Sequence, residues 1–145
     1  MIQTERLLQT FCTLVSFDSP SCGERKICDY LKETLKQLGL AVTEDDAAEK
    51  IGGTAGNIYA VLPATQGMES LPPLLFSGHM DTVEPSHGKQ TVVHPDGTIT
   101  SNGETVLGAD DCAALAAILE ALSVIQADQL PHRMIEVLFS AAEES

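Results

Sequence analysis

A short apolar run that ends abruptly in polar residues constrains the fold most. Leu74–Phe76 follow two prolines, and Gly78 leads directly into His79 and Asp81. Three successive apolar residues between such breaks predict a buried strand of an α/β sheet rather than an amphipathic helix. Ligands of open α/β sheets bind at the carboxyl ends of strands, so a histidine and an aspartate there indicate a site. If the backbone stays extended, residues 79 and 81 share a face, and the imidazole could bind a metal beside the carboxylate.

Apolar spacing and turn residues predict the other elements. Helices are expected over about residues 4–15 and 23–38, where apolar side chains recur at helical spacing. Asp96-Gly97 between short β-prone runs predicts a hairpin near 92–101. Strands are expected near 41–45, 57–62, 74–79 and 133–140, the last two parallel and adjacent or one strand apart. We therefore expect an α/β fold with a mixed, largely parallel sheet covered by helices.

Composition limits the class of protein. A chain of 145 residues that is 43% hydrophobic and 20% charged can form one domain with a substantial core. The 21 acidic against 8 basic residues give a net charge of −13, which argues against nucleic acid or an anionic membrane as partner. The sequence shows no signal-peptide pattern and no apolar run of membrane-spanning length, so a cytoplasmic location with reduced cysteines is expected.

A pair of aspartates marks the start of the longest predicted helix. Asp110 and Asp111 open a helix expected over about 110–126, which is apolar on nearly every side and therefore largely buried. For Asp111 we favour an N-cap or a role in supporting a ligand residue. Asp110 follows Gly108 and a second small residue, where the backbone can approach a ligand closely, and its carboxylate could bridge two cations.

A pair of glutamates follows the last predicted strand. Glu143 and Glu144 come directly after the apolar segment near 133–140. Two strand ends and one helix start would then direct five side chains to the same end of the sheet: His79, Asp81, Asp110, Glu143 and Glu144. This convergence indicates a metal site more strongly than any one of the motifs.

These three motifs, in this order, resemble those of a known peptidase family. His79-Met80-Asp81-Thr82-Val83, Gly108-Ala109-Asp110-Asp111 and Glu143-Glu144 are similar to motifs of the co-catalytic zinc peptidases. That family includes peptidase T, the glutamate carboxypeptidases and the acetylornithine deacetylases, and the segment from Asp96 to Asp111 resembles the peptidase T branch most.

The resemblance implies a role for each site residue. His79 would bind one zinc ion, Glu144 the other, and Asp110 would bridge both. Asp81 would steady the His79 ring, and Glu143 would act as general base. The substrate would be a short peptide, hydrolysed in an aminopeptidase reaction of the tripeptide type.

The resemblance also has departures. Cys112 stands where the peptidase T pattern has a lysine, and Ala114 stands where it has a glycine. The family pattern continues past the paired glutamates, so residues 1–145 would be the N-terminal portion of a catalytic domain, without the lid or dimerisation domain and the later ligands. Such a chain should bind zinc weakly, lack activity alone, and expose an apolar sheet edge that invites self-association.

Two other functions stay open from the sequence. A deacylase of N-acyl amino acids would use the same ions and the same base. A non-catalytic, truncated interaction or regulatory module is the third interpretation, although the order of the clusters fits a receiver-type domain poorly.

Overall fold

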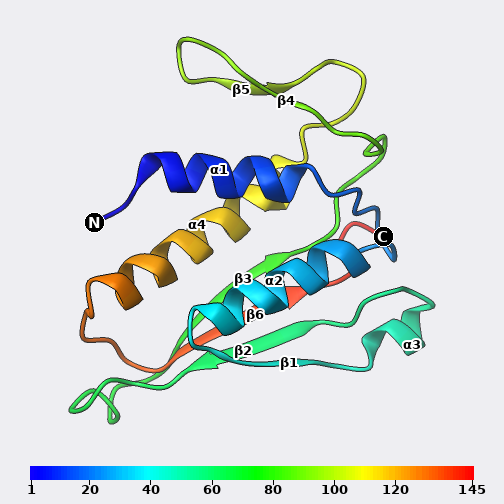
Figure 1. The fold of residues 1–145 in the computed structure, drawn as a ribbon. Coiled ribbons are helices and arrows are strands. Elements are labelled where there is room, and N and C mark those ends of the chain that lie inside the picture. Colours follow the sequence, from blue (N-terminus) through cyan, green and yellow to red (C-terminus); the bar gives the residue numbers. More distant parts are fainter.

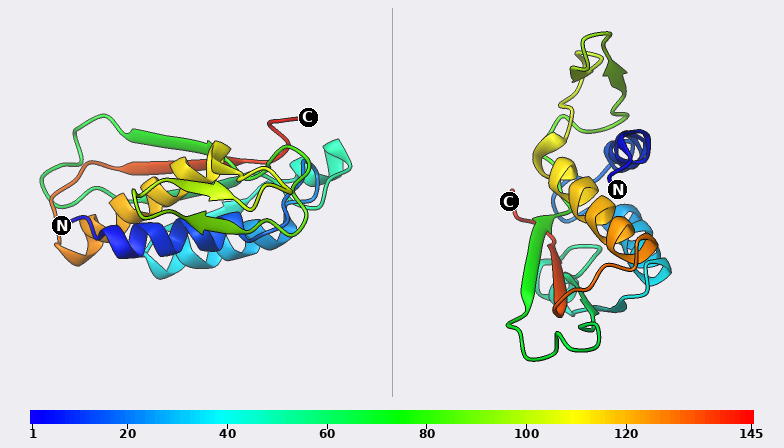
Figure 2. Two further views of the ribbon diagram at one scale, coloured as in Figure 1. Left: turned by 90° about the horizontal axis from the view of Figure 1, so that it is seen from above. Right: turned by 90° about the vertical axis from the view of Figure 1, so that its left-hand side faces the viewer.

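The computed structural model describes residues 1–145, in which helices cover one face of a four-stranded sheet (Figures 1 and 2). The helices are α1 Thr4–Val15, α2 Arg25–Gln37, α3 Ala47–Ile51 and α4 Ala109–Ala127. The strands are β1 Ala41–Glu44, β2 Ile58–Leu62, β3 Leu74–His79, β4 Thr91–Val93, β5 Ile99–Ser101 and β6 Ile135–Ser140. The predicted helices and strands are confirmed, and β4 and β5 form the predicted hairpin, which projects beyond α1 in Figure 1.

The sheet has the strand order β1-β2-β6-β3. Strands β3 and β6 are adjacent and parallel, as predicted, with Leu74 opposite Ile135 and His79 opposite Ser140. A mixed sheet is confirmed, but the expectation of a largely parallel one is wrong, because β1–β2 and β2–β6 are antiparallel. Only the connection from β3 to β6 contains a crossover helix, α4, and parallel neighbours require such a crossover.

Strand β3 lies at the edge of the sheet, with β6 as its single neighbour. Leu74 and Leu75 are 43% and 53% exposed, so the expectation of a fully buried strand is wrong for its first half. The strand becomes buried only at its carboxyl end, where His79 is 8% exposed and Met80 is fully enclosed. The amide of Met80 also donates to the Ser140 carbonyl, which continues the pairing with β6 one residue further.

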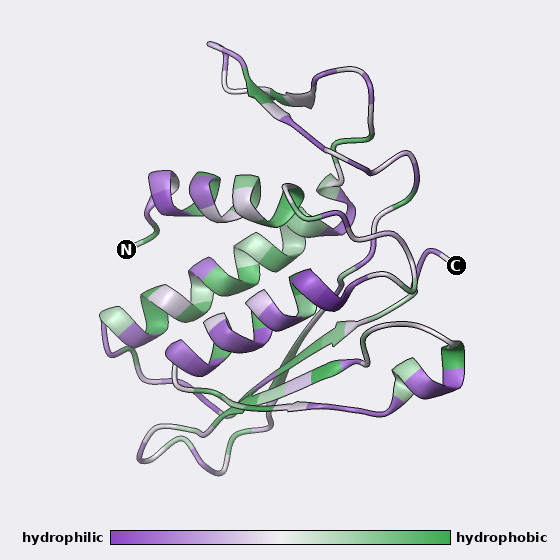
Figure 3. Ribbon diagram, turned by 45° about the vertical axis from the view of Figure 1, so that its right-hand side comes forward, coloured by the Kyte–Doolittle hydropathy of each residue, from purple (hydrophilic) through white to green (hydrophobic).

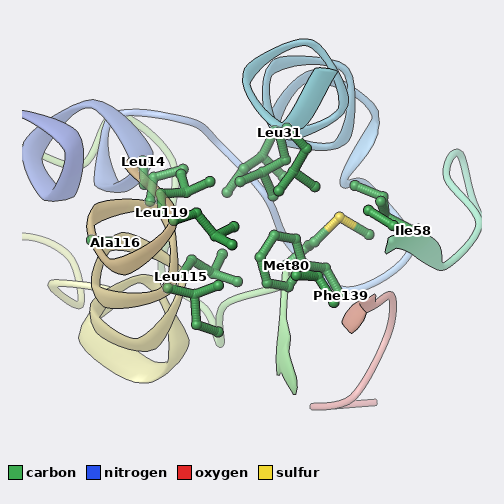
Figure 4. Close-up of a cluster of buried hydrophobic side chains, with 14 of the residues drawn as sticks. Leu14, Leu31, Ile58, Met80, Leu115, Ala116, Leu119 and Phe139 are labelled. Carbon is green, nitrogen blue, oxygen red and sulfur yellow. The ribbon is translucent and has the colours of Figure 1, made fainter. Parts of the chain in front are cut away.

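The core fills the space between the sheet and the helices. Ile135, Val137 and Phe139 of β6 alternate with more exposed residues, so one face of the sheet is apolar and faces the helices. Figure 4 shows Phe139 and Met80 meeting Leu115 of α4 in this layer. Because Met80 is anchored in the core, the residues on either side of it are held in fixed positions at the end of β3.

Helix α4 is largely apolar along its length, as Figure 3 shows, and it packs on α1 and β3. Its one buried charge is Glu120, whose carboxylate accepts hydrogen bonds from Arg6 Nε at 2.7 Å and Arg6 Nη2 at 2.9 Å. This ion pair links α1 to α4. No helix in the chain is long and apolar enough to span a membrane.

Candidate metal centre

His79 is the most enclosed member of the site. It ends β3 with a side chain that is 9% exposed, opposite Ser140, the last residue of β6. Its Nδ1 lies 2.9 Å from the main-chain oxygen of Asp81 and 3.3 Å from Asp81 Oδ1. Its Nε2 faces outward and lies 3.0 Å from Asp110 Oδ1. Asp81 therefore lies beside the ring as predicted, and its closest contact is made by the backbone carbonyl.

Asp111 supports His79 from the start of α4. Its Oδ2 accepts the backbone N–H of His79 at 3.3 Å. A Cβ atom on Gly78 would lie 2.9 Å from this oxygen and 3.1 Å from Leu115 Cδ2, so the close approach requires glycine. Gly108 is the N-cap of α4, and Asp111 itself has the non-helical angles φ −118° and ψ 23°. Of the two predicted roles for Asp111, the structure favours the supporting one over the cap.

Asp81 connects three segments beneath the site. Its fully buried carboxylate accepts the Ser21 hydroxyl at 2.6 Å and the backbone N–H groups of Glu143 and Glu144 at 3.0 and 2.9 Å. Burial alone would raise the pKa of Asp81, but these hydrogen bonds outweigh burial and leave the pKa below its usual value. The ionised carboxylate thus fixes both the His79 ring and the glutamate pair.

Glu143 and Glu144 lie in a turn after β6. Their carboxylates approach His79 Nε2 to 3.9 and 4.0 Å, and their side chains are 57% and 25% exposed. In an extended segment the two side chains would point to opposite sides. Here Ala142, with a left-handed φ of 54°, precedes the pair, and both carboxylates lie near the same ring.

The structure brings the three predicted metal ligands together. One ligand atom each from His79, Asp110 and Glu144 lies within 4.8 Å of the others. Burial disfavours a charged imidazole, but the Asp110 contact and the charges of Asp81 and Asp111 outweigh it and raise the pKa of His79 above its usual value. The carboxylates of Asp81, Asp110 and Asp111 thus favour a positive charge beside the His79 ring. One nitrogen and several carboxylate oxygens form a donor set that suits zinc.

Two supporting residues were not predicted from the sequence. Ser21 donates its hydroxyl to Asp81, and Glu24 accepts the backbone N–H of Ala142 at 2.9 Å. Both lie in the loop between α1 and α2, 60 and 118 residues from their partners. The loop has the composition of a turn, and no local pattern in it indicates contact with the site.

Cys112, one of the two departures from the peptidase T pattern, lies in the core rather than in the site. It is 1% exposed, and burial raises the pKa of its thiol to about 11. The thiol is therefore neutral near pH 7, and this position contributes no positive charge beside Asp111.

The fold and the ligand cluster together define a class: the chain is similar to the catalytic domains of zinc peptidases. Residues 57–145, more than half of the sequence, match the family model of peptidase family M28. The chain belongs to peptidase family M28.

Several known proteins match nearly the whole chain. The uncharacterized protein YqjE of Bacillus subtilis is 39% identical over all 145 residues, and peptidase T of Escherichia coli is 30% identical over 97% of the chain. Among solved structures, a tripeptidase from Staphylococcus aureus has a TM-score of 0.94 at 43% identity, and the aminopeptidase PepT from Bacillus cereus has 0.93 at 41%, each covering 99% of the chain. The chain spans only 38–42% of the length of these four proteins.

Proposed function

We propose that this chain is the N-terminal part of a zinc-dependent peptidase that hydrolyses short peptides. The observation that carries the proposal is the cluster of His79, Asp110 and Glu144, with Glu143 beside it. The similarity to a tripeptidase and an aminopeptidase over 99% of the chain supports peptide substrates over N-acyl amino acids, the second substrate class that the motifs allow. The same similarity supports an enzyme rather than an interaction module.

The ligand residues have distinct tasks in this proposal. His79 would hold one ion and Glu144 a second, while Asp110, whose side chain is 81% exposed, would reach both. Bound zinc ions polarise a peptide carbonyl and acidify water, which is the chemistry that peptide hydrolysis near neutral pH needs. The backbone carbonyl and carboxylate of Asp81 keep His79 Nδ1 engaged, so that Nε2 stays directed outward.

Glu143 is the residue best placed to move a proton. Its side chain is 57% exposed, and its Oε2 lies 3.9 Å from His79 Nε2, next to the cluster without belonging to it. A free carboxylate at this position can take a proton from the attacking water and later give it to the leaving amine. Its backbone N–H is tied to Asp81, so the side chain extends from a fixed point.

The isolated chain should bind zinc weakly and hydrolyse no peptide. Its cluster supplies three ligand residues for two ions, whereas a catalytic zinc ion commonly has three protein ligands of its own. Calorimetric titration of the chain with zinc, beside a tripeptide hydrolysis assay, tests this expectation. Tight binding of two ions together with turnover would show that other residues of the chain complete the site.

A chimaera tests the proposed activity directly. Residues 1–145 would replace the matching segment of the Staphylococcus aureus tripeptidase, whose structure aligns with 99% of this chain. We expect the chimaera to bind zinc and to hydrolyse a tripeptide in preference to an N-acetyl amino acid. A folded chimaera that binds zinc but cleaves no peptide would contradict the proposal. The His79→Ala chimaera is the control for activity that does not depend on the site.

A further inference from the structure

One carboxylate oxygen joins two unusual backbone positions next to the metal centre. Glu24 lies directly before α2 and is fully buried. Its Oε1 accepts the backbone N–H of Cys22 at 2.9 Å and that of Ala142 at 2.9 Å. Ala142 belongs to the turn that carries Glu143 and Glu144. In Figure 1 the C-terminal segment accordingly ends near the loop that precedes α2.

Both partners of Glu24 have left-handed backbone conformations. The φ angle is 68° at Cys22 and 54° at Ala142, and Gln129 is the one other non-glycine residue with a positive φ. L-residues with side chains rarely adopt this region, and they keep it where the surrounding structure holds them there. A single oxygen that receives both N–H groups is such a restraint.

Packing alone does not explain a glutamate at this position. The second oxygen of Glu24, Oε2, is buried and has no hydrogen-bond partner. A buried polar atom without a partner costs free energy, and an apolar side chain of similar size would avoid that cost. What the apolar side chain could not do is accept the N–H groups of Cys22 and Ala142. The acceptor oxygen is therefore the feature of Glu24 that the structure uses.

The bond to Ala142 controls where the next two side chains lie. The amides of residues 142, 143 and 144 donate in turn to Glu24, Asp81 and Asp81. Two buried carboxylates thus hold three successive amides, and the glutamate side chains leave this turn toward His79. If the restraint on Ala142 were lost, the turn could relax to an ordinary backbone conformation and carry Glu144 away from His79.

We propose that Glu24 is a positioning residue of the metal centre, which fixes the turn at Ala142 so that Glu144 faces His79. The assignment of a metal rests on the proposed function, whereas the restraint of the turn can be tested without any metal. The carboxylate of Glu24 accepts hydrogen bonds from backbone N–H groups alone, so it would act through the backbone.

Nuclear magnetic resonance on the 15N-labelled 145-residue chain tests both parts. The variants are Glu24→Ala, Glu24→Gln, which keeps an oxygen acceptor, and Glu33→Ala as matched control, because Glu33 is an exposed glutamate on α2. In Glu24→Ala we expect the Ala142 amide proton to exchange with solvent at least about tenfold faster than in the parent chain. We also expect this variant to bind zinc about tenfold more weakly. Glu24→Gln should recover most of both properties, and Glu33→Ala should match the parent chain.

The two failures can be told apart. If neither the parent chain nor the tripeptidase chimaera binds zinc, the proposed metal site is wrong, and exchange of the Ala142 amide alone then decides whether Glu24 restrains the turn. If the parent binds zinc and Glu24→Ala binds it equally, or keeps the Ala142 amide protected, the positioning role is overturned. If Glu24→Ala does not fold, the parent chain and Glu24→Gln are measured instead. The positioning role is overturned if the Ala142 amide of the parent exchanges as fast as its Ser145 amide.

Discussion

At the scale of single residues, the adjacent glutamates differ in exposure, and we propose different tasks for them. Glu144 belongs to the ligand cluster, and the more exposed Glu143 lies beside it. In the chimaeric enzyme we expect Glu143→Ala to keep its zinc and lose turnover by about 10²–10⁴-fold, the usual contribution of a general base. Glu144→Ala should lose zinc instead. Metal analysis and initial rates measure both effects, and near-normal turnover of Glu143→Ala would show that the roles are wrong or reversed.

The glycine before His79 is required by a close contact rather than by its backbone angles. We expect Gly78→Ala to lower the free energy of unfolding by about 1–3 kcal/mol, because the new Cβ would meet Asp111 Oδ2 at 2.9 Å and Leu115 at 3.1 Å. Urea denaturation measures the change. Ser77→Ala, at an exposed position of the same strand, is the control and should stay within about 0.5 kcal/mol of the parent. Equal stability of the two variants would contradict the importance of this contact.

Sequence patterns identified the residues that meet at the site and two that support them, Asp81 and Asp111, but not the supporting residues of the first loop. His79, Asp110 and Glu144 could be predicted because each directly follows or opens a recognisable element, and such ends converge in an α/β fold. The supporting contacts of Ser21 and Glu24 could not, because a hydroxyl or carboxylate in a loop can bond to any segment that folding brings near it. The bend at Ala142 was also missed, since nothing in Ala-Ala-Glu-Glu indicates a left-handed residue.

At the scale of elements, Glu44 links β1 to α2. Its carboxylate accepts Arg25 Nη1 and Nη2 at 2.9 Å each, Lys32 Nζ at 2.6 Å and the Gly56 N–H at 3.0 Å. The bond from Arg25 contributes most to lowering the pKa of Glu44 from 4.5 to about 2, against the opposing effect of burial. A carboxyl whose folded pKa is depressed stabilises the fold fully above its unfolded pKa and loses that contribution as the pH falls through its folded pKa.

We therefore expect the chain to lose stability between about pH 4.5 and pH 2 in a way that depends on Glu44. The linked free energy is on the order of 3 kcal/mol at most. The Glu44→Gln variant should be less stable near pH 6, and the difference from the parent should shrink toward pH 2. Urea denaturation at several pH values measures this. Glu33→Gln is the control, and a difference that stays constant with pH would contradict the prediction.

The errors at this scale concern partners and one missed short helix, α3, rather than boundaries. The start of α4 was predicted to within one residue, because Gly108 and the aspartates mark it. Its ion pair with Arg6 was missed, since the partners lie 114 positions apart and leave no sequence signal. The antiparallel direction of β2 relative to β6 was likewise missed, because β3, the hairpin and α4 all lie between these strands in the sequence and leave their relative direction open.

At the scale of the whole molecule, the exposed half of β3 should make the isolated chain associate with itself. Leu75 is 53% exposed on an edge strand, opposite Glu136 of β6. We expect Leu75→Lys to reduce association while keeping the fold, because lysine can pair with Glu136. Sedimentation velocity over a range of concentrations measures the effect. Val92→Lys, an exposed position on the separate hairpin, is the control. A parent chain that stays monomeric throughout would contradict the prediction.

The hydrogen bonds between Asp81 and the amides of residues 143 and 144 also bear on how the site is completed during synthesis. They close a loop of more than 60 residues that includes the hairpin and α4. On a ribosome the first three-quarters of these 145 residues can begin to collapse before that closure, but Asp81 then lacks two of its partners. Glu144 can therefore approach His79 only after β6 has left the exit tunnel and docked beside β3, and a nascent chain that stops before β6 lacks the cluster.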